Sequence, residues 1–109
     1  MDKIETCLAL DFYGNLLTEK MRVTAEYYYF DDLSLAEIAE TYGTSRQAVH
    51  ATIKRATKLL EDYETKLGLI RRFTLQKKEV NEAIELLNSD KKQDALEILK
   101  KVRDELITE

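Results

Sequence analysis

The residues best suited to recognition chemistry form a polar, largely basic group between positions 45 and 58. They are Ser45, Arg46, Gln47, His50, Lys54, Arg55 and Lys58. Arginine can bind guanine, and glutamine adenine, through two hydrogen bonds each, so Arg46 and Gln47 are our candidates for base recognition. Lys54, Arg55 and Lys58 are candidates for contacts to phosphate oxygens, which position a protein on nucleic acid.

Two helix start signals place this polar group on the second helix of a helix-turn-helix. Ser34 and Glu37 have the spacing of a capping box, which predicts that a helix begins at Leu35. Gly43 ends that helix, because glycine adopts the left-handed backbone without steric cost. Ser45 follows as a second N-cap, so only a short turn separates the helices and the second must cross the first. The polar group then lies on the outer face of the second helix.

Other kinds of chemistry fit these residues less well. A solvated helix face is the simplest alternative for the basic side chains. His50 and Cys7 are the only histidine and the only cysteine, and neither has a partner at metal-ligand spacing. The sequence contains no phosphate-binding glycine loop and no nucleophile motif. We therefore expect no enzyme activity, no cofactor and no metal site.

The net charge of -4 hides a strongly basic segment. Residues 1–42 contain nine acids and three bases, residues 43–78 contain three acids and nine bases, and residues 79–109 contain nine acids and five bases. No acid occurs from Gly43 to Leu60. A basic segment within an acidic chain indicates a local surface that binds an anion, and the helix-turn-helix signals favour DNA as that anion.

Length and composition predict a single all-α domain. The 109 residues suffice for one core, and the chain contains no proline, the residue that breaks helices. We expect a helix-turn-helix core over residues 1–70 and further helices over residues 71–109. The expected helices cover residues 3–13, 19–30, 35–42, 46–66 and 71–87, with a last helix that begins after a capping box of Asp90 and Gln93.

An apolar stripe extends the second motif helix beyond the length that a helix-turn-helix needs. Its members alternate in steps of four and three, as in a coiled-coil seam, and they are Val49, Ile53, Ala56, Leu60, Tyr63, Leu67 and Ile70. We favour packing of this seam on the chain's own C-terminal helices. The alternative is a homodimer contact made by Ile53, Ala56, Leu60, Tyr63 and Leu67.

The C-terminal segment is predicted to form a hairpin of two antiparallel helices. One apolar stripe consists of Phe73, Val80, Ile84 and Leu87, and the other of Ala95, Leu99, Val102 and Leu106. Packing of one stripe against the other would bury both.

Nothing in the sequence indicates a membrane protein or a secreted one. No apolar run is long enough to span a bilayer, and no charged and apolar leader opens the chain. The single Cys7 cannot form an internal disulfide. We expect a cytoplasmic protein that does not bind membranes.

The helix-turn-helix segment resembles the DNA-binding region four of bacterial sigma factors. The matching positions are Ile38, Ala39, Gly43, Ser45, Val49, Arg55 and Ala56. The resemblance implies a helix-turn-helix bundle with a long recognition helix. One position departs from the pattern: region four places an apolar residue where this chain has Thr52, with Ile53 one position later. This departure bears on how the recognition helix docks.

A longer resemblance covers nearly the whole chain. From its tyrosine-rich second helix through SRQAVHATIKR, LLEDYE and LGL, the sequence is similar to the small YlxM family of helix-turn-helix proteins of Firmicutes. This resemblance implies a bacterial cytoplasmic protein that is encoded beside signal recognition particle genes and acts in or regulates that pathway.

Two functional hypotheses follow from the residues and the resemblance. The first is a regulatory DNA-binding protein, which needs a homodimer or a partner for useful affinity because a single motif reads few base pairs. The alternative is an accessory protein that binds the signal recognition particle GTPase or its RNA and modulates its activity.

Overall fold

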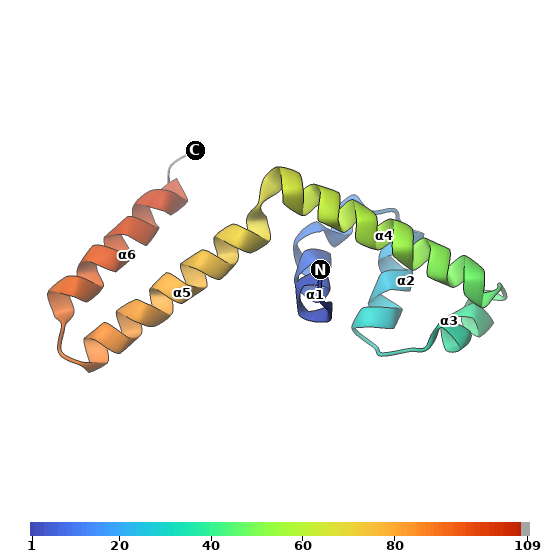
Figure 1. Ribbon diagram of the computed structural model, residues 1–109, viewed down its shortest axis with the longest axis horizontal. Helices are drawn as coiled ribbons and strands as arrows, with labels where there is room; N and C mark the ends of the chain where they lie inside the picture. Colours follow the sequence, from blue (N-terminus) through green and yellow to red (C-terminus); the bar gives the residue numbers. More distant parts are fainter. Residues whose placement is uncertain (108–109) are drawn as a thin grey trace. The chain divides into compact units, whose positions relative to one another are not determined.

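The computed structural model describes residues 1–107, and it confirms the predicted all-α class. The chain forms two compact units, one from Met1 to Ile70 and a second that begins at Arg71. Within the first unit α4 lies across the three preceding helices, and within the second α5 runs antiparallel to α6 (Figure 1). The elements are α1 (Lys3–Tyr13), the 3₁₀ turn η1 (Gly14–Leu16), α2 (Glu19–Tyr29), α3 (Leu35–Tyr42), α4 (Arg46–Leu67), α5 (Leu69–Asn88) and α6 (Lys92–Ile107).

The helix-turn-helix is formed by α3 and α4, and its ends are set by the residues that the sequence predicts. The Ser34 hydroxyl accepts a hydrogen bond from the Glu37 amide at 3.1 Å, and the Glu37 carboxylate accepts one from the Ser34 amide at 3.0 Å. Gly43 has a φ of 64°, the left-handed conformation expected at the end of a helix. The Ser45 hydroxyl accepts from the Ala48 amide and caps α4. The predicted capping box and short turn are therefore confirmed.

The crossing of α3 and α4 is held by a small hydrophobic cluster. Ile38 and Ala39 of α3 pack with Val49 and Ile53 of α4, and all four are buried. The short Ala39 side chain allows the two helix axes to approach closely at this point. This cluster fixes which face of α4 points away from the protein.

Farther along α4, Ala56 and Leu60 belong to a larger core that is shared with α1 and α2. The buried members of this core are Ala9, Leu10, Tyr13, Leu17, Ala25, Ala56, Leu60 and Ile70. The interpretation that favoured the C-terminal helices as the partner of the α4 seam was wrong, because α1 and α2 supply the packing surface. The alternative that placed Ala56 and Leu60 in a homodimer contact was also wrong, since both are buried within one chain. Tyr63 is half-buried against the same core, whereas Leu67 is 52% exposed.

A group of three partly buried hydrogen bonds joins α1 to the junction between α4 and α5. The Tyr13 hydroxyl donates to Glu64 Oε1 at 2.7 Å and accepts from the Leu69 amide at 3.0 Å. The same Glu64 oxygen accepts from the Ile70 amide at 2.9 Å. Burial, reinforced by the hydrogen bond to Glu64, raises the pKa of Tyr13 above its ordinary value. Gly68, with a φ of 65°, allows the chain to turn at this junction.

Replacing Tyr13 by phenylalanine is expected to lower the free energy of unfolding by about 1–3 kcal/mol, because the Leu69 amide loses its acceptor and Glu64 loses a donor. The raised pKa also predicts a pH effect. The contribution of the neutral hydroxyl is fully present below the pKa of an unfolded tyrosine, about 10, and is lost as the pH rises through the higher folded pKa. Urea unfolding at pH 7 and at alkaline pH measures both effects. The difference between wild type and Tyr13→Phe should shrink at alkaline pH, and a constant difference would contradict this role.

The turn of the C-terminal hairpin differs from the predicted one. Asp90 has a φ of 59°, and the Lys91 amide donates to the Leu86 carbonyl at 2.8 Å. Asp90 therefore ends α5 in the left-handed position that glycine usually occupies. An N-cap needs an extended backbone, so the predicted capping box of Asp90 and Gln93 was wrong.

The interior of the hairpin also differs from the predicted stripes. Phe73, Val80, Ile84 and Leu87 of α5 are 39–51% exposed, and the residues turned inward are Gln76, Glu79, Ala83 and Leu86. In α6 the prediction was right for Ala95 and Val102, which are buried, and wrong for Leu99 and Leu106, which are exposed. Two small side chains, Ala83 of α5 and Ala95 of α6, are almost fully buried, whereas most of the larger apolar side chains of the predicted stripes are exposed.

Candidate nucleic-acid interface

The outer face of α4 carries every residue that the sequence analysis proposed for nucleic-acid contact. Ser45, Arg46, Gln47, His50, Lys54, Arg55 and Lys58 are all exposed. Their burial pattern follows from the crossing with α3, because Val49 and Ile53 occupy the inward face of the same turns. We call this set of seven residues the α4 outer face. The structure brings them together on one helix, as the sequence predicts.

The first turn of α4 presents the two candidates for base recognition. Arg46 and Gln47 are exposed at its start, directly after the N-cap. The Ser45 hydroxyl is engaged with the Ala48 amide at 3.1 Å, so its first role is to hold this end of the helix in place. Thr44 is also exposed in the preceding turn, and a threonine hydroxyl can contact phosphate. Thr44 is not among the residues predicted from the sequence, although its place before the N-cap could have indicated it.

The cationic side chains of the α4 outer face differ in the interactions that they make within the protein. Lys58 forms an ion pair with Asp62 at 3.1 Å, one turn farther along the helix. Arg55 donates a hydrogen bond to the Thr52 hydroxyl at 3.3 Å. Within residues 1–107, Arg46 and Lys54 take part in no ion pair. These two cations are the ones most available to an anionic ligand.

Thr52, the position that departs from sigma-factor region four, is accommodated without loss of packing. It is 8% exposed, and its hydroxyl donates to the Ala48 carbonyl at 3.1 Å. The polar group is thus satisfied by its own helix, while Ile53 fills the apolar cluster beside it. The departure does not displace α4 from α3.

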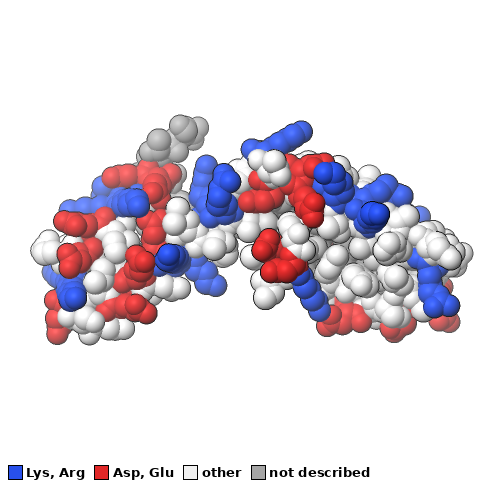
Figure 2. All heavy atoms as spheres, in the orientation of Figure 1, with Lys and Arg blue, Asp and Glu red and all other residues white. Residues whose placement is uncertain are grey.

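Opposite charges lie on different sides of the first unit. Blue side chains follow the first half of α4, and red side chains gather along the opposite edge of the same unit (Figure 2). No acid occurs from Gly43 to Leu60, whereas α1, α2 and α3 with their connections carry nine acids against three bases. A ligand with negative charge is therefore attracted to the α4 outer face and repelled by the other side.

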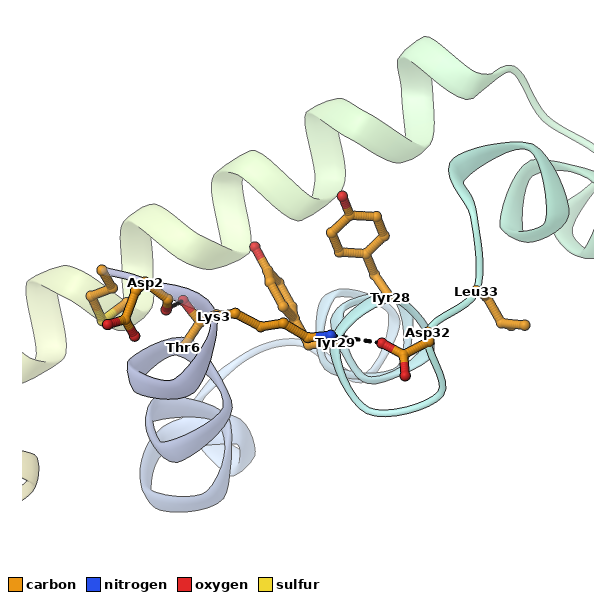
Figure 3. A pocket seen from close by; sticks show the side chains of 8 residues that line it. Asp2, Lys3, Thr6, Tyr28, Tyr29, Asp32 and Leu33 are labelled. Carbon is orange, nitrogen blue, oxygen red and sulfur yellow. Dashed lines mark hydrogen bonds and ion pairs between the residues drawn. The ribbon is translucent and has the colours of Figure 1, made fainter.

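An open pocket lies between the start of α1 and the end of α2 (Figure 3). Across it, the Lys3 ammonium and the Asp32 carboxylate form an ion pair at 2.8 Å, and the hydrogen bond and charge of Asp32 raise the pKa of Lys3. Asp2 is engaged as the N-cap of α1 through the Glu5 amide. Lys3, Asp32 and Asp2 in this pocket thus stabilise the local structure through an ion pair and a helix cap. The lining residues are Met1, Asp2, Lys3, Thr6, Tyr28, Tyr29, Asp32 and Leu33.

Neither a metal site nor a membrane span appears in the part of the chain that the structure describes. Residues 1–107 contain no group of three or more histidine, cysteine, aspartate or glutamate side chains placed to hold a metal ion. His50 is exposed on the α4 outer face. None of the helices in the same residues has the length and apolar character needed to cross a membrane.

The capped turn, the crossing helices and the exposed polar face of α4 define this chain as a helix-turn-helix protein. It belongs to the UPF0122 family, whose description is "Putative helix-turn-helix protein, YlxM / p13 like" and which it matches over residues 2–106. The predicted family is thus confirmed.

Similar proteins occur in several bacteria. The chain is 50% identical over 91 residues to a UPF0122 protein of Desulforamulus reducens, covering 84% of this chain and 78% of that protein. It is 46% identical over 102 residues to a UPF0122 protein of Clostridium kluyveri, covering 91% and 92%. It is 45% identical over 89 residues to the UPF0122 protein YlxM of Bacillus subtilis, covering 82% and 81%.

Proposed function

We propose that this protein is a regulatory DNA-binding protein that uses the α4 outer face. The observation that supports this most directly is the exposure of Arg46, Gln47 and Lys54 on the first part of one capped helix, where no acid occurs up to Leu60. The second helix of a helix-turn-helix enters the major groove with its first residues at the base edges. Arg46 and Gln47 occupy that place, and Lys54 lies two turns farther along, where it reaches the phosphate backbone.

A titration of fluorescent duplex DNA with the protein tests this proposal, with polarisation anisotropy as the readout. Release of counterions from neutralised phosphates makes binding salt-dependent, so three phosphate contacts predict about 40-fold weaker binding when salt rises from about 50 to 200 mM. A duplex of random sequence should bind measurably at the lower salt. Absence of binding to any tested duplex at low salt would contradict the proposal.

The alternative function is that of an accessory protein of the signal recognition particle, which binds its GTPase or its RNA and modulates activity. The charge separation in the first unit favours this alternative, because the acidic side could meet a basic protein surface while the α4 outer face meets RNA. Capture of the tagged chain's partners from a cytoplasmic extract separates the two functions. Recovery of the GTPase that resists nucleases supports the accessory role, whereas recovery of chromosomal fragments that is lost with DNase supports DNA binding.

A further inference from the structure

The Thr52 hydroxyl is a polar group in a buried place on α4. Thr52 is 8% exposed, and a valine of nearly the same shape would fill the same space, so packing alone does not require the hydroxyl. The hydroxyl donates to the Ala48 carbonyl at 3.1 Å, which uses its hydrogen within its own helix. A hydroxyl oxygen also has two acceptor lone pairs. These lone pairs can accept from a donor one helical turn farther along α4.

Arg55 supplies that donor. Its Nη2 donates to the Thr52 hydroxyl oxygen at 3.3 Å, across the three-residue spacing at which helix side chains are neighbours. The Ala48 carbonyl, the Thr52 hydroxyl and the Arg55 guanidinium thus form one chain of hydrogen bonds, in which each bond polarises the next. A free arginine side chain samples many rotamers, and fixing it costs conformational entropy. The bond to Thr52 restricts Arg55 before any ligand binds.

The partner that holds Arg55 is neutral, so the charge of the guanidinium is not offset. Arg55 takes part in no ion pair within residues 1–107. A guanidinium has five N–H donors, and one bond to Thr52 leaves most of them for a ligand. Lys58 shows the contrast, because the carboxylate of Asp62 holds its ammonium at 3.1 Å and offsets its charge.

Arg55 lies at one edge of the α4 outer face. It is exposed, and its spacing of three residues from the buried Thr52 places the two side chains about 60° apart around the helix axis. The major groove is about as wide as a helix, so the middle of an inserted helix faces the base edges and its two sides face the phosphate backbones. A guanidinium of fixed orientation can bind two phosphate oxygens at once.

The other threonines of α4 make only the local bond to their own helix. The Thr57 hydroxyl donates to the Ile53 carbonyl at 2.8 Å, and the Thr65 hydroxyl donates to the Glu61 carbonyl at 2.9 Å. Within residues 1–107 no arginine donates to either hydroxyl. The bond from Arg55 is therefore particular to Thr52 and is not a general property of threonines on this helix.

We propose that Thr52 is a positioning residue, whose hydroxyl holds the Arg55 guanidinium at the edge of the α4 outer face for contact with a phosphate of the DNA backbone. Because Thr52 is buried, it acts through Arg55 and does not touch the DNA itself. This inference rests on the DNA binding proposed above. It adds to that binding a residue that does not belong to the α4 outer face.

A double-mutant cycle between Thr52 and Arg55 tests the proposal, with anisotropy titrations of duplex DNA at low salt as the readout. Thr52→Val should weaken binding about 2- to 10-fold, because Arg55 must then be ordered at the moment of binding. The same substitution added to Arg55→Ala should cause no further loss. Thr52→Ser keeps the hydroxyl and should bind as the wild type does.

Thr57→Val is the matched control, since it removes a half-buried hydroxyl from the same helix without touching Arg55. Its affinity for duplex DNA should stay that of the wild type, and thermal unfolding checks that every variant is folded. A loss of affinity on Thr52→Val that is equally large with and without Arg55 overturns the proposal. So does a Thr52→Ser variant that loses as much affinity as Thr52→Val.

Nuclear magnetic resonance relaxation of the Arg55 side-chain Nε–H group in the DNA-free chain gives a readout that does not need DNA. The Arg55 side chain should be more ordered than that of Arg46, and Thr52→Val should remove this difference. Equal order of Arg55 in the wild type and in Thr52→Val overturns the proposal. Failure of the proposed DNA binding has a different signature, namely no duplex binding by the wild type although Thr52 still orders Arg55, and it overturns the phosphate contact as well.

Discussion

Replacing Arg46 and Lys54 together by alanine is expected to weaken binding to duplex DNA by about 100-fold or more, since each charged contact contributes roughly 1–3 kcal/mol. Both side chains are exposed on the α4 outer face, and neither is used in an ion pair within residues 1–107. Neither supports the core, so the variant should keep the thermal stability of the wild type. Anisotropy titrations at low salt, with circular dichroism as the folding check, measure the effect.

A matched control removes the same number of charges elsewhere. Lys66→Ala with Lys91→Ala changes the net charge equally, and both lysines are exposed and are not members of the α4 outer face. The affinity of this control variant for duplex DNA should fall by much less than that of the variant that lacks Arg46 and Lys54. If the two double variants lose affinity to the same extent, binding depends on net charge alone and the assignment of the site is wrong.

Within the α4 outer face, Lys58→Ala should lower the affinity for duplex DNA less than Lys54→Ala does, because Lys58 already pairs with Asp62. The same anisotropy titration measures both variants.

Replacing Leu60 by alanine is expected to lower the free energy of unfolding by about 2–5 kcal/mol, because it removes buried methyl groups and leaves a cavity. Leu60 is 1% exposed in the core that α4 shares with α1 and α2. A loss of this size is a large part of the stability of a small domain. Urea unfolding followed by circular dichroism gives the difference.

Leu67 provides the control for this prediction, because it belongs to the same predicted seam and is 52% exposed. Leu67→Ala should change the free energy of unfolding by about 0.5 kcal/mol or less. Equal losses for Leu60→Ala and Leu67→Ala would mean that the whole seam is buried in solution, which would contradict the packing of α4 described above.

The sequence was informative where a single residue determines local geometry. Ser34 with Glu37, Gly43 and Ser45 correctly indicated both ends of α3 and the start of α4, because caps and left-handed glycines act on their own backbone neighbours. The exposure of the α4 outer face followed from the same signals, since the position of the crossing decides which residues of α4 turn inward. Contact with nucleic acid stays a prediction.

The sequence was less informative about which surfaces meet. Most of the predicted seam of α4 is buried, although Leu67 is exposed. Its periodicity carries no information about its partner: Val49 and Ile53 pack against α3, whereas Ala56 and Leu60 pack against α1 and α2. In the hairpin, large apolar residues suggested the interior, whereas the smaller Ala83 and Ala95 are among its buried residues and Ile84, Leu87 and Leu99 are exposed. The predicted capping box at Asp90 was wrong for a related reason. Aspartate is common both at helix starts and in left-handed turns, and only the backbone conformation distinguishes the two.

The most direct test of the central claim is a nuclear magnetic resonance titration of the isotope-labelled full chain with a short DNA duplex. The claim is that the α4 outer face is the surface that binds nucleic acid. We expect the largest amide shifts to fall between Thr44 and Lys58, and the amides of the acidic residues of α1 and α2 to shift little. Shifts centred on α1 and α2, or on α5 and α6 with α4 unchanged, would contradict it.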